Sequence, residues 1–185
     1  MSLSSKDIVV TFVAFGVIGA SSFALYRDFV ATSSVSQEKI GTITYKKKKA
    51  ERKFSSRATW EGLSQSSPVY NHDSIKTAES ASATINLNDG TVLDLDENTL
   101  VVLAINKGEA AVDVGSGSLF ANGQGSSALT VRAKGNTITT KKGSLSLSLD
   151  KDDVKLRMVS GGASVAATGG TQTVSGDEAL HLSGG

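Results

Sequence analysis

Hydrophobic and polar residues alternate most regularly between Ser82 and Ile105. From Ala83 to Leu87 every second residue is small or apolar, and the residues between them are polar. A period of two is how a β-strand turns one face to a core and the other to water. Asp89-Gly90 interrupts the pattern before it resumes at Val92. An Asp-Gly pair between two such runs predicts a hairpin, because glycine accepts the positive φ of the tight turn.

The same scheme continues along the rest of the chain after residue 38. It predicts about a dozen short strands joined by turns rich in Gly, Ser, Asn and Asp, at spacings near ten residues. The fold class is therefore all-β, and the architectures that fit are a β-sandwich, a jelly roll or a β-solenoid. We expect the following side chains in the core: Trp60, Ile85, Leu87, Leu93 and Leu95.

The N-terminal region has a different pattern. Ile8 to Tyr26 is an apolar run of 19 residues without a charge, and a helix of about 20 residues spans the hydrocarbon core of a bilayer. The run predicts a single transmembrane helix at 8–26, after a short cytoplasmic N-terminus at 1–7 and before a polar linker at 27–38 and a β domain at 39–185. A cleaved signal peptide is an alternative, because Ser22-Phe23-Ala24 has the small-x-small form of a peptidase site. The single Lys6, offset by Asp7, favours a retained anchor.

The predicted helix carries small residues on one stripe, at Gly16, Ala20 and Ala24. This small-xxx-small spacing lets two membrane helices approach closely. It is the sequence feature that suggests packing against a partner helix or a second copy of the chain. Charge alone places the C-terminal domain in the cytoplasm by a narrow margin, because few Lys and Arg flank the helix.

Basic charge is concentrated near the start of the predicted β domain. Residues 1–60 hold ten Lys or Arg and four Asp or Glu, a net of +6, whereas residues 61–185 hold nine and fourteen, a net of −5. The simple interpretation of the basic run is a solvated loop or hairpin tip. The functional one is a contact surface for an acidic protein, an anionic lipid or a cell-wall polymer. Its members are Lys46, Lys47, Lys48, Lys49, Arg52 and Lys53. Nucleic-acid binding is disfavoured, because no recognition motif accompanies the run.

Residue types that carry catalysis are scarce. The chain has no cysteine and two histidines, His72 and His181, which excludes disulfides and thiol catalysis and leaves little for a zinc site. No nucleophile elbow or phosphate-binding loop is present, and the acidic stretches lack the spacing of a calcium loop. We therefore expect a protein that is not an enzyme and binds no cofactor or metal.

Several of these residues together resemble the pattern of the FecR domain family. The matching positions are Trp60, Leu63, Asn71 to Thr77, Ser82 to Leu87, Asp89-Gly90, Glu97 to Thr99, Gly161-Gly162 and Gly176 to Leu180. The resemblance implies an inner-membrane anchor with the β domain in the periplasm, and on this point we prefer it to the charge count. His72 departs from the family, which usually has Gly before the turn aspartate. Only residues 1–7 precede the helix, so the family's sigma-factor-binding segment has no counterpart to carry over.

Three functions fit these observations. The first is a non-enzymatic, membrane-anchored periplasmic interaction or scaffold module that docks a protein partner in an envelope assembly, through exposed strands or the basic run. The alternative is a transmembrane signalling regulator of the FecR, anti-sigma type. The third is a cell-wall or glycan binder, which calls for an aromatic-lined cleft although the chain has one Trp and three Tyr. Whether the natural protein continues past Gly185 is left open.

Overall fold

The computed structural model describes residues 21–23, 38–106, 109–124, 128–151, 153–167 and 169–183. The chain divides into two units, Met1–Gln37 and Glu38–Gly185, and the fold below is that of the second. Of the predicted membrane helix only 21–23 are described, and these are helical. No described helix is long and apolar enough to cross a membrane. The predicted packing residues Gly16, Ala20 and Ala24 lie outside the described residues.

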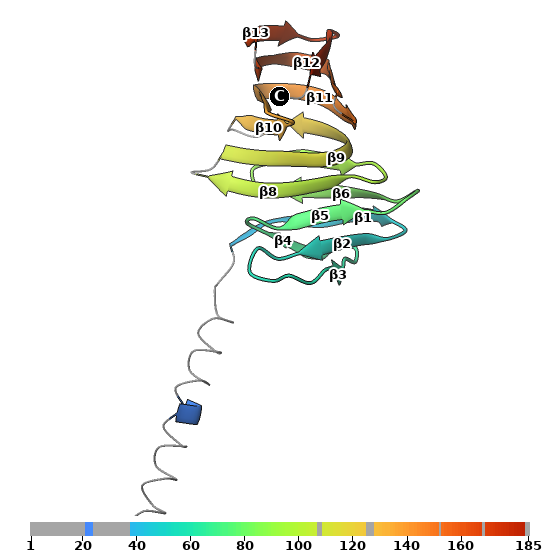
Figure 1. Cartoon of the computed structure of the whole chain (residues 1–185), viewed down its shortest axis with the longest axis vertical. Coiled ribbons are helices and arrows are strands. Elements are labelled where there is room, and N and C mark those ends of the chain that lie inside the picture. Colours follow the sequence, from blue (N-terminus) through green and yellow to red (C-terminus); the bar gives the residue numbers. More distant parts are fainter. Residues whose placement is uncertain are drawn as a thin grey trace, which may run out of the picture. The chain divides into compact units, whose positions relative to one another are not determined.

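The second unit is built from strands and turns, so the all-β prediction is confirmed for the part of the chain described. The strands are β1 (Lys39–Lys47), β2 (Ala50–Lys53), β3 (Glu61–Gly62), β4 (Pro68–Tyr70), β5 (Ser74–Thr77), β6 (Ser82–Leu87), β7 (Val92–Leu95), β8 (Leu100–Asn106), β9 (Glu109–Gly123), β10 (Leu129–Ala133), β11 (Asn136–Asp150), β12 (Asp153–Ala167), β13 (Gly170–Ser175) and β14 (Ala179–Ser183). Figure 1 shows them stacked from β3 at one end to β13 at the other.

The pairing divides this stack into two layers. Sheet I runs β3-β2-β5-β8-β9-β10-β11-β12-β13. Sheet II runs β4-β1-β6-β7-β9-β11-β12-β14. All pairs are antiparallel except β9 with β10. Because β9, β11 and β12 appear in both orders, these three strands join the sheets.

Each joining strand is 15 residues long and passes from one sheet to the other at a glycine. Gly117 in β9, Gly143 in β11 and Gly161 in β12 have φ values of 84°, 148° and 77°. These angles are in the region that only glycine enters without strain. The register of β11 against β12 shifts at the same place, between Thr140 and Gly143. The glycines therefore mark the bends that let one strand serve two layers.

The core lies between the layers and follows the predicted alternation. Ile85, Leu87, Leu93 and Leu95 are 0–5% exposed, as predicted. The predicted hairpin between β6 and β7 is confirmed, with Gly90 at a φ of 92°. The prediction for Trp60 is wrong: its side chain is only partly buried and does not belong to the core cluster. Its place on the outside of sheet I is described below.

Candidate functional site

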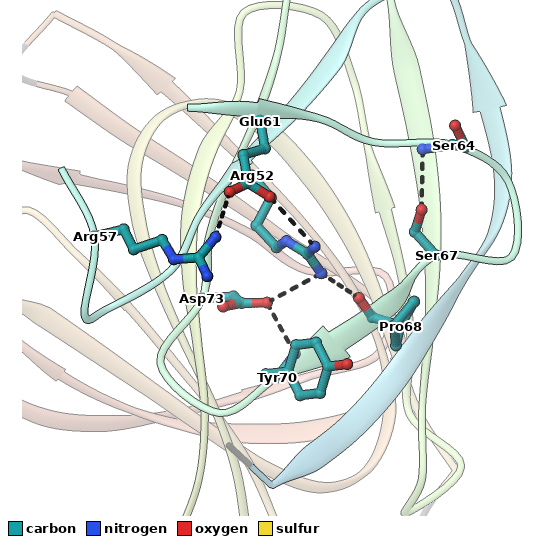
Figure 2. Close-up of polar contacts among 8 residues, drawn as sticks. All are labelled: Arg52, Arg57, Glu61, Ser64, Ser67, Pro68, Tyr70 and Asp73. Carbon is teal, nitrogen blue, oxygen red and sulfur yellow. Dashed lines mark hydrogen bonds and ion pairs between the residues drawn. The ribbon is translucent and has the colours of Figure 1, made fainter. Parts of the chain in front are cut away.

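The described residue with the most unusual surroundings is Arg52 on β2. Its neighbour across the sheet is Ile75, which is fully buried, so Arg52 projects inward on the same face. The guanidinium donates to the Pro68 carbonyl at 2.6 Å and lies 4.1 Å from the centre of the Phe54 ring. Its Nη1 is 3.8 Å from Asp73 Oδ2. Figure 2 shows Arg52 among Glu61, Pro68, Tyr70 and Asp73.

Asp73 is placed by the tight turn between β4 and β5. The Tyr70 N–H donates to Asp73 Oδ2 at 2.9 Å, and the Asp73 N–H donates to the Tyr70 carbonyl. His72, which precedes Asp73, has a φ of 65°, which explains why glycine suits this position. A carboxylate that accepts from the backbone three residues earlier closes the turn and fixes the start of β5.

The Asp73 carboxyl is 0% exposed. Burial raises its pKa, and the Tyr70 hydrogen bond and the Arg52 charge offset the rise only in part. Asp73 Oδ1 and Arg52 Nε have no hydrogen-bond partner among the described residues. The pair therefore holds the turn against the sheet and carries a desolvation cost, which is the behaviour of a structural ion pair.

Aromatic and charged side chains extend this pair into a cap over the N-terminal end of the core. Arg57 lies 5.0 Å from the Phe54 ring and donates to Glu61 at 2.7 Å. The Phe54 and Tyr70 ring centres are 5.9 Å apart. We call this set the polar cap: Arg52, Phe54, Arg57, Glu61, Tyr70 and Asp73.

Trp60 lies on the outer face of sheet I, where the side chains of two lysines cover its ring. The Lys76 ammonium is 4.2 Å from the Trp60 ring centre and that of Lys53 is 5.6 Å away, which are cation–π distances. Glu51 completes the group through ion pairs with Lys49 at 3.0 Å and Lys76 at 3.1 Å. Hydrogen bonds from these two ammonium groups lower the pKa of Glu51, and the bond from Lys49 has the larger effect.

The structure brings together only part of the predicted basic surface. Lys47, Lys48 and Lys49 are exposed and Lys46 is half-buried. Lys48 has a φ of 58° in the link between β1 and β2. Because β1 belongs to sheet II and β2 to sheet I, this link is an arch between layers and not a hairpin tip. We call Lys46 to Lys49 the basic arch.

Arg52 and Lys53 leave that surface. The Arg52 side chain is 12% exposed and belongs to the polar cap, and Lys53 lies over Trp60. An open depression beside the arch is lined by Lys47, Asp96 and Glu97 among others. Two carboxylates thus border the arch on one side.

Metal and catalytic chemistry has no gathered site in the described part of the chain. No group of three or more His, Asp or Glu side chains there is arranged to hold a metal ion. Two acidic residues in the stretch from Asp94 to Glu97 have structural contacts instead. Asp94 accepts from Thr84 Oγ1 at 2.6 Å, and Glu97 accepts from the Ser80 N–H at 2.5 Å.

Sequence reasoning missed the Arg52–Asp73 pair. Asp73 belongs to the family pattern, whereas Arg52 stands in a run of lysines, and this context predicts a surface position for it. The only available signal was the alternation of β2, in which Ala50 and Arg52 share the inward face.

Fold and site together define a two-layered all-β domain. The polar cap covers one end of its core, and the buried Arg52–Asp73 pair fixes the turn there. A family model described as "FecR protein" matches residues 73–174, which is more than half of the chain. The chain belongs to the FecR family.

Individual proteins match different lengths of the chain. An uncharacterized protein of Treponema pallidum (strain Nichols) is 39% identical over 62 residues, which cover 34% of this chain and 9% of that protein. Two crystal structures of a candidate anti-sigma factor from Parabacteroides distasonis ATCC 8503 match with a TM-score of 0.50 and 16% identity. Each match covers 60% of this chain and 59% of the other, and at that identity it shows the fold alone.

Proposed function

We propose that this chain is a FecR-type signalling regulator whose β domain binds a protein partner outside the cytoplasm. In this proposal residues 8–26 anchor it in the inner membrane and the β domain lies in the periplasm. The regulator does no catalysis and needs no cofactor. It changes the state of a second membrane or cytoplasmic protein when the β domain is occupied.

The observation that carries the proposal is the FecR family match over residues 73–174. The shared fold with a candidate anti-sigma factor supports it. The Arg52–Asp73 pair also fits, because it stabilises the turn at which the matched region begins.

A second candidate is the scaffold module, favoured by the exposed ammonium groups of the basic arch. An anionic lipid, a cell-wall polymer or an acidic protein would meet Lys47, Lys48 and Lys49 there. The bordering Asp96 and Glu97 weaken that surface, so we place this function second. Glycan binding has less support, since Trp60 is covered by lysines.

Crosslinking in intact cells, followed by purification of the full-length chain and mass spectrometry, tests the first proposal against the second. A regulator recovers a sigma factor or a signal-receiving membrane protein, and this recovery depends on residues 1–26. Recovery of one envelope assembly and no regulatory protein would contradict the regulator and support the scaffold.

A charge-reversal variant of the basic arch sharpens the result. Changing Lys47, Lys48 and Lys49 to Glu abolishes recovery if the arch is the docking surface. The matched control changes three other exposed lysines, Lys134, Lys141 and Lys142, to Glu, which alters net charge equally. A loss that both variants share would report overall charge and not the arch.

A further inference from the structure

The chain enters the second unit at Glu38, and asparagines from two separate turns hold its backbone there. The Glu38 carbonyl accepts from the N–H of Asn71, in the turn between β4 and β5, at 2.9 Å. The Ile40 carbonyl accepts from the N–H of Asn88, in the turn between β6 and β7, at 2.8 Å. Asn88 Nδ2 also donates to the Lys39 carbonyl at 2.7 Å. We call Glu38 to Ile40 the entry segment, and these contacts fix it against sheet II.

The Asn71 side chain binds the C-terminal end of β8, in sheet I. Its Nδ2 donates to the Ile105 carbonyl at 3.1 Å, and its Oδ1 accepts from the Ile105 N–H at 2.9 Å. Beside it in the turn, the His72 N–H donates to the Leu103 carbonyl, and the Leu103 N–H donates to the Asp73 carbonyl. Backbone groups two residues apart on a strand point the same way. The Asn71 amide therefore continues this ladder to the end of β8.

Asn71 thus binds both layers with different parts of one residue, its backbone in sheet II and its side chain in sheet I. The turn around it is held closed, because Asp73 accepts from the Tyr70 N–H and is buried beside Arg52. A displacement of the entry segment that moves the Asn71 backbone would pull the side-chain amide away from Ile105. Each hydrogen bond lost in this way changes an opening equilibrium by about fivefold.

We propose that Asn71 couples the entry segment to the end of β8, so that the two open and close as one. Local opening at either place then favours opening at the other, and this coupling is reciprocal. The use of the coupling in signalling rests on the proposed function, because a regulator needs a route from the β domain to the segment before Glu38. The coupling itself does not depend on that function.

Native-state amide exchange, followed by NMR on the full chain, tests the coupling. The reporters are the N–H of Ile105 for the end of β8, that of Asn88 for the entry segment and that of Val165 in β12 for the rest of the domain. In urea too dilute to unfold the domain, Ile105 and Asn88 should share one opening free energy and one urea dependence, distinct from those of Val165. Different values for Ile105 and Asn88 would overturn the proposal. One value for all three would do so too, because only global opening would then be present.

The variant Asn71→Ala removes both bonds to Ile105 and keeps the backbone N–H that donates to Glu38. It should speed exchange at Ile105 and, by about fivefold or more, at Asn88 as well. A purely structural side chain would affect Ile105 and leave Asn88 unchanged, and that result would contradict the coupling.

The matched control is Thr140→Val, in β11. It removes the hydrogen bond from Thr140 Oγ1 to the Gly162 carbonyl, at 2.8 Å, and touches neither the entry segment nor β8. It should leave the ratio of exchange rates at Asn88 and Val165 unchanged, whereas Asn71→Ala should raise that ratio. An equal change in both variants would report global stability and would count against the proposal.

The reverse variant, Asn88→Ala, decides if Asn71→Ala fails to fold. It removes the Nδ2 bond to the Lys39 carbonyl and leaves β8 untouched, so faster exchange at Ile105 supports the coupling and unchanged exchange contradicts it. Crosslinking in cells judges the proposed function separately. Coupled exchange without recovery of a regulatory partner would reject the regulator and keep the coupling, and uncoupled exchange with such recovery would do the opposite.

Discussion

Arg52 and Asp73 meet inside the N-terminal end of the domain, with Arg52 Nη1 3.8 Å from Asp73 Oδ2 and the carboxyl fully buried. Both groups are largely shielded from solvent, so water cannot solvate either charge in place of its partner. The value of the pair therefore appears when one member is removed, because the other is left buried with an uncompensated charge.

Asp73→Ala should lower the free energy of unfolding by about 3 kcal/mol, the lower end of the range for a broken buried pair. Urea unfolding followed by circular dichroism measures this. Asp113→Ala is the control: Asp113 pairs with Arg132 at 3.3 Å while both side chains are about half exposed, so its loss should cost less than about 1 kcal/mol. Equal effects of the two changes would contradict a structural role for Asp73.

The raised pKa of Asp73 makes stability depend on pH. Folding raises the proton affinity of the Asp73 carboxyl, so protonation of this group stabilises the folded state. This stabilisation is fully present below the ordinary pKa of 3.8 and is lost as pH rises through the higher pKa of the folded state. Relative to Asp73→Asn, which does not titrate, the native chain should gain stability as pH falls towards 3.8. Urea midpoints of both proteins at several pH values give the difference, and a constant difference would refute it.

His72→Gly should stabilise the domain by up to about 1 kcal/mol, because glycine enters the left-handed region without the strain of a Cβ. The backbone bond from His72 N–H to the Leu103 carbonyl, 2.8 Å, needs no side chain. Thermal unfolding should show a higher midpoint. Ser74→Gly in extended β5 should do the reverse, as glycine weakens a strand.

Gly161→Ala should destabilise by about 2 kcal/mol or more, since it combines a positive φ with a clash. A Cβ there would run into the Lys142 carbonyl and lie 2.9 Å from Gly143 Cα. The neighbouring Gly162→Ala is the matched control, because its Cβ would approach nothing nearer than the Val174 carbonyl at 3.4 Å. Chemical unfolding of both variants should separate them clearly.

Local patterns predicted much of this structure. Alternation placed Ile85 and Leu93 in the core, and Asp89-Gly90 predicted the hairpin, because strand period and turn chemistry depend on adjacent residues. The division into two sheets could not be predicted, since it depends on bends within β9, β11 and β12 and on pairings far apart in the chain. For the same reason Arg52, predicted on the surface, is largely buried, and Trp60, predicted in the core, lies on the outer face of sheet I. The position of each is set by partners such as Asp73 and Lys76 that no local pattern identifies.

The sequence distance between paired strands has a consequence for how the chain folds. β1 does not pair with the next strand in the sequence, β2, but with β4 and β6, so that Gly41 lies opposite Val69 and Leu87. β11 and β12, by contrast, pair from Thr137 with Ala166 to Asp150 with Asp153 through a single turn. Short loops close at a lower entropic cost than long ones. During synthesis β1 would therefore emerge first but pair late. The long hairpin of β11 and β12 would form as soon as both strands have been synthesised.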